Sequence, residues 1–68
     1  MTLGETIKYY RTQLNLSQAE LADRIGVSRQ AVTKWETDTG IPDINNIQIL
    51  AKLFHISIDT LLSSDHHV

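Results

Sequence analysis

The sequence predicts an all-α domain, and three observations carry the prediction. Apolar residues recur at three- and four-residue steps along the 68-residue chain, which is the period of a helix buried on one face. No apolar run alternates with the period of two that marks a half-buried strand. Finally, a residue able to cap a helix precedes each periodic run. These capping residues are Thr2, Ser17, Ser28, Asp43 and Ser57.

Length and composition narrow the class of protein. A chain of 68 residues has room for one domain with a small core. It has no cysteine, which excludes disulfides and thiolate metal sites and suits a reducing cytoplasm. No segment approaches the roughly 20 apolar residues that span a bilayer, and the start lacks a signal-peptide pattern. We therefore expect a cytoplasmic protein with no membrane partner.

The first expected helix runs from Leu3 to Gln13. Thr2 and Glu5 have the spacing of a capping box, in which each side chain bonds the other residue's backbone amide. The same spacing recurs at Ser17 and Glu20 before the second helix. The apolar positions of the first helix fall on one face, which we expect to be buried; they are Leu3, Ile7, Tyr10 and Leu14.

Two short helices joined by a sharp turn follow. The first of them spans Gln18 to Ile25 and ends at Gly26, because glycine tolerates the left-handed backbone that closes a helix. The second spans Arg29 to Glu36 after the N-cap Ser28. In such a unit the second helix stands out from the surface, so its outward side chains can bond base edges or phosphates. These side chains are Arg29, Gln30, Thr33 and Lys34.

A fourth and a fifth helix complete the domain. Asp43 caps the fourth, which reaches about Phe54, and Ser57 caps a short fifth. Residues 64–68 lose all periodicity, so we expect a domain over residues 1–63 and a frayed C-terminal tail. The apolar residues expected on one inward face of the fourth helix are Ile44, Ile47, Leu50, Ala51 and Phe54, and the fifth helix holds Ile58, Leu61 and Leu62.

Charge is distributed unevenly along the chain. Six Lys and Arg against eight Asp and Glu leave a net charge of −2, whereas nucleic-acid binders are usually basic. Between Arg24 and Lys34, however, there are three cations and no acid, while Asp43, Asp59 and Asp65 lie in the C-terminal third. We therefore expect a positive field around the turn and a negative one at the far end.

Several sequence motifs, taken together, indicate a family. The segment RTQLNLSQAELADRIGVSRQAVTKWE, then Pro42, IQILAKLFHIS and LL, closely resembles the Cro/repressor-type helix-turn-helix domain of Xre-like regulators, over Thr2 to about Ser63. The resemblance implies a compact five-helix, lambda-repressor-like fold whose second and third helices form the helix-turn-helix. It also implies a transcriptional regulator of bacteria or phages, expected to be a repressor, that docks its third helix in the major groove of double-stranded operator DNA.

The resemblance further implies roles for individual residues. Gln18 aligns with a glutamine that bonds a DNA phosphate. The family often has Gly or Asn two residues after the Trp-Glu pair, where this chain has Asp38, and this charge puts a phosphate contact by the loop in question. Asn45 and Asn46 are therefore kept as weaker phosphate candidates. The positions that touch bases and the nearby backbone correspond to Ser28, Arg29, Gln30, Thr33 and Lys34.

Arg11 is expected to form an ion pair. It lies at the edge of the first apolar stripe, where a lone charge would be costly. Glu36, on the inner side of the third helix, is the best-placed acid, and the resemblance implies a pair at these two positions. The alternative is that Arg11 extends its head to water or phosphate.

The end of the chain is expected to mediate homodimerisation. Four apolar residues crowd into a helix too short to bury all of them, and a two-fold contact there would present both third helices to successive major grooves about 34 Å apart. The alternative is a contact with a C-terminal domain or a protein partner. The residues expected at the interface are Ile58, Leu61 and Leu62, next to Ile56.

A second function class stays open, namely a protein-binding module such as an antitoxin or a repressor domain that mainly engages a partner protein. The isoelectric point of about 5.8 favours it slightly. An enzyme is not expected, because the sequence shows no nucleophile with a base at helical spacing and no glycine-rich phosphate loop. Neither a cofactor nor a metal is expected, and His66 and His67 are interpreted as solvated residues of the tail.

Overall fold

The computed structural model describes residues 1–63, and within them it contains five helices and no strand. Their bounds agree with the sequence prediction, so the all-α, five-helix fold is confirmed. The expected frayed tail, with His66 and His67, lies outside the described residues. The helices are α1 (Leu3–Gln13), α2 (Gln18–Ile25), α3 (Arg29–Glu36), α4 (Ile44–Phe54) and α5 (Ile58–Leu62).

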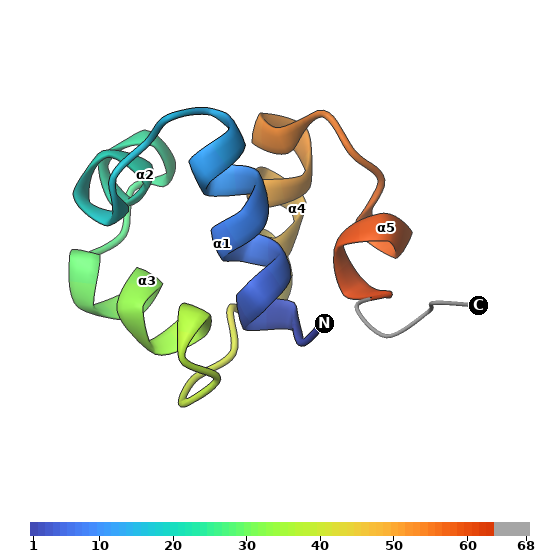
Figure 1. The fold of residues 1–68 in the computed structure, drawn as a ribbon, viewed down its shortest axis with the longest axis horizontal. Coiled ribbons are helices and arrows are strands. Elements are labelled where there is room, and N and C mark those ends of the chain that lie inside the picture. The colour runs from blue at the N-terminus through green and yellow to red at the C-terminus, as the bar shows by residue number, and fades with distance from the viewer. Residues whose placement is uncertain (64–68) are drawn as a thin grey trace.

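The helices are arranged around α1 (Figure 1). In that view α2 and α3 lie on one side of α1, and α5 lies on the other, toward the opposite end of the long axis. The principal extents are 33 × 24 × 22 Å. No helix within residues 1–63 has the length and apolar character needed to cross a membrane. The molecule thus has a helix-turn-helix end and an α5 end.

Each helix begins at its expected cap. The side chains of Thr2, Ser17, Ser28, Asp43 and Ser57 each accept a hydrogen bond from the backbone amide three residues later. The two predicted capping boxes are complete. Hydrogen bonds with Ser17 lower the pKa of Glu20 below its ordinary value of 4.5. At the other end of α2, Gly26 adopts a left-handed φ of 78°, which local sequence reasoning anticipated.

The apolar faces of all five helices meet in one core. Its completely buried members include Ile7, Leu21, Val32, Leu50 and Leu61. Two expected inward positions are wrong, because they lie at helix ends. Leu14 caps the end of α1 and is 42% exposed, and Ile44 opens α4 and is 61% exposed.

The N-terminus of α1 approaches the C-terminal end of α3 at Gly4. A Cβ atom there would overlap the carbonyl oxygen of Trp35 and lie 2.9 Å from that of Glu36. Asp38, which adopts a left-handed φ of 60°, accepts hydrogen bonds from the Gly4 amide at 3.1 Å and the Thr2 hydroxyl at 2.7 Å. The carboxylate that departs from the family pattern therefore caps α1, where the helix dipole favours a negative charge.

Candidate nucleic-acid interface

The outer face of α3 carries the expected recognition residues. Arg29, Gln30 and Lys34 are exposed, and Thr33 is half-buried. Ser28 is exposed, and its hydroxyl oxygen accepts a hydrogen bond from the Ala31 amide at 3.1 Å. The hydrogen of that hydroxyl stays available to a phosphate or a base.

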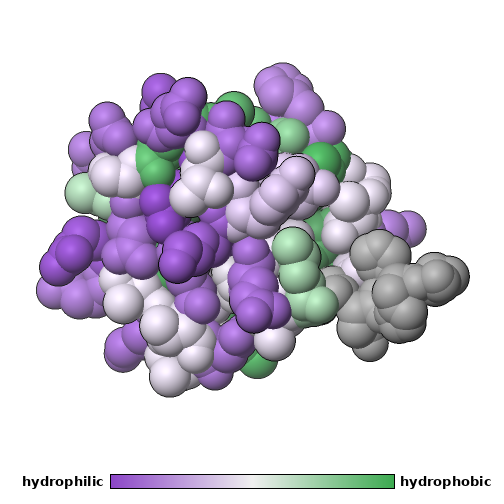
Figure 2. All heavy atoms as spheres, in the orientation of Figure 1, coloured by the Kyte–Doolittle hydropathy of each residue, from purple (hydrophilic) through white to green (hydrophobic). Residues whose placement is uncertain are grey.

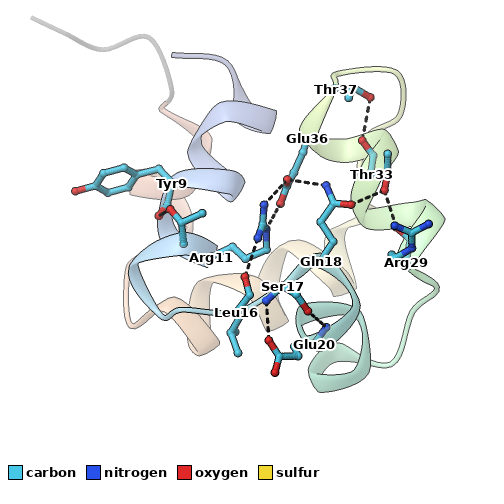
Figure 3. Close-up of polar contacts among 11 residues, drawn as sticks. Tyr9, Arg11, Leu16, Ser17, Gln18, Glu20, Arg29, Thr33, Glu36 and Thr37 are labelled. Carbon is cyan, nitrogen blue, oxygen red and sulfur yellow. Dashed lines mark hydrogen bonds and ion pairs between the residues drawn. The ribbon is translucent and has the colours of Figure 1, made fainter.

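A buried ion pair fixes α3 against α1 (Figure 3). Arg11 donates from Nε to Glu36 Oε2 at 2.6 Å and from Nη2 to Glu36 Oε1 at 3.0 Å. Its remaining nitrogen, Nη1, donates to the Leu16 carbonyl oxygen at 2.7 Å. The two side chains are only 10% and 3% exposed. The expected pair is present, and its two-pronged geometry ties the end of α3 to α1 and to the segment before α2.

Gln18 joins this pair to the face of α3. Its Nε2 donates to Glu36 Oε1 at 3.0 Å, and its Oε1 accepts from the Thr33 hydroxyl at 2.8 Å (Figure 3). The sequence interpretation placed both side chains at the DNA without this link. A buried carboxylate such as that of Glu36 still has free lone pairs after it accepts two hydrogen bonds from an arginine. This is the signal from which a further donor, here Gln18, could have been predicted.

Asn45 and Asn46 lie in the first turn of α4. Asn45 is exposed and Asn46 is half-buried. Asp43 accepts a hydrogen bond from the backbone amide of Asn46 at 2.9 Å. The structure does not bring either side chain into the network of Arg11, Glu36, Gln18 and Thr33.

The outer face of α3 is more favourable to an anion than the net charge suggests, although α2 carries the exposed acids Glu20 and Asp23. Of the two acids near the C-terminal end of α3, Glu36 is buried and paired with Arg11, whereas Asp38 is exposed and bonded to the N-terminal end of α1. Arg29 and Lys34 remain exposed on α3. Figure 2 shows that the side of the molecule that carries α2 and α3 is largely hydrophilic.

The residues expected at a dimer interface do not share one environment. Leu61 has no exposed surface, so placing it in an interface was wrong: it faces the domain's own core. Leu62 is 47% exposed and Ile58 is half-buried. At this end α4, Ile56 and the start of α5 line an open, mostly apolar surface cavity of about 380 Å³. Its lining residues are Gln48, Ile49, Ala51, Lys52, Ile56 and Ile58.

Two packed short helices, the second with an exposed polar face, define the class of the protein as a helix-turn-helix domain. A model of the helix-turn-helix family matches residues 7–61. The chain therefore belongs to this family, in its Cro/repressor (Xre) type, and the resemblance noted in the sequence is confirmed.

Relatives and solved structures agree with this assignment. The chain is 38% identical over 65 residues to the transcriptional activator BcrR of Enterococcus faecalis, covering 96% of this chain and 32% of BcrR. A crystal structure of the P22 c2 repressor with a synthetic operator matches with a TM-score of 0.88 and 35% identity, covering 96% of this chain and 98% of that one. The SinR protein in a complex with the SinI protein matches with a TM-score of 0.86 and 29% identity, covering 96% and 64%.

The chain covers only part of the length of most of the curated regulators it matches. It spans between 29% and 58% of the length of four of them, including BcrR. The similarity therefore concerns the helix-turn-helix domain of those proteins.

Proposed function

We propose that this chain binds double-stranded DNA sequence-specifically, as the DNA-binding domain of a cytoplasmic transcriptional regulator, and most simply a repressor. The observation that carries the proposal is the exposed face of α3, with Arg29, Gln30 and Lys34, on a helix that the Arg11–Glu36 pair holds against α1. A helix held in this way can enter the major groove as one rigid body. Membership of the helix-turn-helix family supports the same function.

The chemistry of the face suggests what it reads. The Gln30 amide can make two hydrogen bonds to adenine, and Arg29 or Lys34 can donate to the two acceptors of guanine. Each half-site should then contain both bases. Gln18 keeps one N–H beyond its bond to Glu36, and this N–H together with Ser28 can bond phosphates. Asn45 and Asn46 remain weaker phosphate candidates.

Selection of bound sequences from random duplex DNA, at moderate salt, tests the function. The parent chain should enrich a two-fold symmetric motif, and an Arg29→Ala/Gln30→Ala variant should lose it. Gln30→Ala alone should cost about 1–3 kcal/mol at one base position. A variant of Gln18, by contrast, should weaken binding to all sequences alike. A motif unchanged in the double variant would contradict the assignment of α3 as the reader.

Salt dependence gives a second readout. Few cations face outward from α3, so the logarithm of affinity should fall less steeply with salt than it does for proteins with about 6–10 phosphate contacts. An equally steep slope would mean that further phosphate contacts exist.

We further propose that the chain binds DNA as a homodimer. With Leu61 assigned to the core, the candidate contact is the surface formed by Ile58, Leu62 and the cavity between α4 and α5. Leu62→Asp should abolish cooperative operator binding while leaving the fold intact. Sedimentation with and without operator DNA checks this, and a chain that stays monomeric and binds single, asymmetric sites would contradict it.

One observation favours a second candidate function, the engagement of a partner protein. The cavity between α4 and α5 is mostly apolar, and the structurally similar SinR occurs in a complex with the SinI protein. If selection enriches no DNA sequence at all, we take the partner-binding function in preference to the DNA-binding one.

A further inference from the structure

The buried carboxylate of Glu36 constrains which way hydrogen bonds run across the α2–α3 junction. An ionised carboxylate can only accept, and here Glu36 accepts from Arg11 and from Gln18. Gln18 must therefore turn its amide nitrogen toward Glu36. Its carbonyl oxygen then faces Thr33, as Figure 3 shows.

Thr33 has a single hydroxyl hydrogen and two inward partners. These are the Gln18 Oε1 atom at 2.8 Å and the Arg29 carbonyl oxygen at 3.1 Å. Both partners are acceptors, so the hydrogen points into the protein whichever of them receives it. The half-buried Thr33 hydroxyl can therefore only accept a hydrogen bond from a ligand.

The edge of the reading face therefore has a fixed polarity, an N–H from Gln18 beside an acceptor from Thr33. We propose that Thr33 accepts a hydrogen bond from an exocyclic amino group in the major groove, either N6 of adenine or N4 of cytosine, and that Glu36 is the positioning residue that sets this polarity without touching DNA. Phosphate oxygens, guanine O6 and N7, and thymine O4 are acceptors and cannot bond Thr33 there. The inference rests on the proposed reading of DNA by α3.

Two substitutions at Thr33 separate its hydrogen bond from its shape. Thr33→Val keeps the branched shape and removes the oxygen, whereas Thr33→Ser keeps the oxygen. In selection from random duplex DNA, the valine variant should lose a preference for adenine or cytosine at one position of each half-site. The serine variant should retain that preference.

Base analogues then test the single hydrogen bond. Purine in place of adenine, or 2-pyrimidinone in place of cytosine, removes the amino group alone. At the position identified by selection, the analogue should weaken binding of the parent chain on the order of 3- to 10-fold, as expected for one hydrogen bond. The same analogue should leave the affinity of Thr33→Val unchanged. The analogue that has this effect tells adenine from cytosine.

Glu36→Gln tests the positioning role, because a glutamine there can turn either its oxygen or its nitrogen toward Gln18. The adenine or cytosine preference at the Thr33 position should fall, while the base positions read by Gln30 keep theirs. A merely structural role would lower affinity for all sequences equally. The assay is run at a temperature at which circular dichroism shows the variant to be folded.

Two results would overturn the inference. One is a Thr33→Val motif identical to that of the parent chain, and the other is a Thr33-dependent base pair at which removing the amino group, with purine for adenine or 2-pyrimidinone for cytosine, does not weaken binding of the parent chain more than that of Thr33→Val. If variants of Arg29 and Gln30 still change the motif, the inference alone has failed. If those variants also leave the motif unchanged, the reading of DNA by α3 has failed with it.

Discussion

Both ends of the molecule join the apolar core, but only the α2–α3 end adds a network of partly buried side-chain hydrogen bonds to that packing. At the α2–α3 end, Arg11, Glu36, Gln18 and Thr33 form a chain of directional hydrogen bonds. At the other end α5 joins the core through Leu61, and the side-chain hydrogen bonds of its cap Ser57 stay within the helix.

The difference matters because apolar contact is non-directional and scales with the area buried, whereas hydrogen bonds fix which atom faces which. A surface that distinguishes bases needs fixed donors and acceptors. We infer that the polar network of the α2–α3 end fixes the orientation of its side chains at some cost in stability. The α5 end requires only complementary apolar packing. The substitutions that follow test this contrast.

Removing Glu36 should have the largest effect. Glu36→Ala strands the buried Arg11 charge and the Gln18 amide, so it should lower the free energy of unfolding by about 3 kcal/mol. Urea denaturation followed by circular dichroism measures the change. Replacing both partners by apolar residues, as in Arg11→Met/Glu36→Leu, should cost less than Glu36→Ala because no charge is left buried. An unchanged melting temperature for Glu36→Ala would contradict the buried pair.

Neighbouring leucines probe the α5 end. Leu61→Ala should lower the free energy of unfolding by about 2 kcal/mol, near the low end for a buried leucine. A short helix at the edge of the molecule can shift to fill the space that the leucine side chain leaves. Leu62→Ala, on the exposed neighbour, should change stability by less than about 0.5 kcal/mol. Thermal unfolding of the two variants side by side checks the assignment. Equal losses would mean that α5 packs in another rotation.

The contact of α1 with α3 offers a sharper test at one atom. Gly4→Ala adds a helix-favouring methyl group, yet the Cβ would overlap the Trp35 carbonyl, so we expect a net loss of about 1–2 kcal/mol. Thr12→Ala, at an exposed position of the same helix, is the control and should be near neutral. A gain in stability for Gly4→Ala would show that the two helices lie farther apart.

At the opposite end, His55 closes α4 with a left-handed φ of 58°. His55→Gly relieves this conformation and should raise stability by about 0.5–1 kcal/mol. Thermal unfolding of the variant and of the parent chain measures the change. A loss of stability in the glycine variant would indicate that the imidazole makes a packing contact of its own.

The helices and their caps could be predicted from the sequence because their signals are local. A residue such as Ser17 and the amide it caps are only three positions apart. The Arg11–Glu36 pair was also within reach, since a cation beside an apolar stripe needs a partner. The hydrogen bonds between Thr33 and Gln18 and between Gly4 and Asp38 could not be predicted from the sequence.

Those links, and the burial of Leu61, depend on how separate helices pack. Periodicity placed both Leu61 and Leu62 among the apolar residues of α5, but only the rotation of that short helix against the core decides which of them is buried. Similarly, the sequence alone presents Asp38 as an unfavourable charge near DNA. In the structure α1 lies close to it, and the Thr2 hydroxyl and the Gly4 amide donate hydrogen bonds to its carboxylate.

The most direct test of the contrast between the two ends is an NMR titration of the ¹⁵N-labelled chain with its selected operator duplex. The account predicts that the amide and side-chain shifts of Gln18, Arg29, Gln30 and Thr33 change most, whereas residues of α4 and α5 change only to the extent that two copies meet. Large changes confined to α4 and α5, with α3 unaffected, would contradict the assignment of the α2–α3 end as the surface that reads DNA.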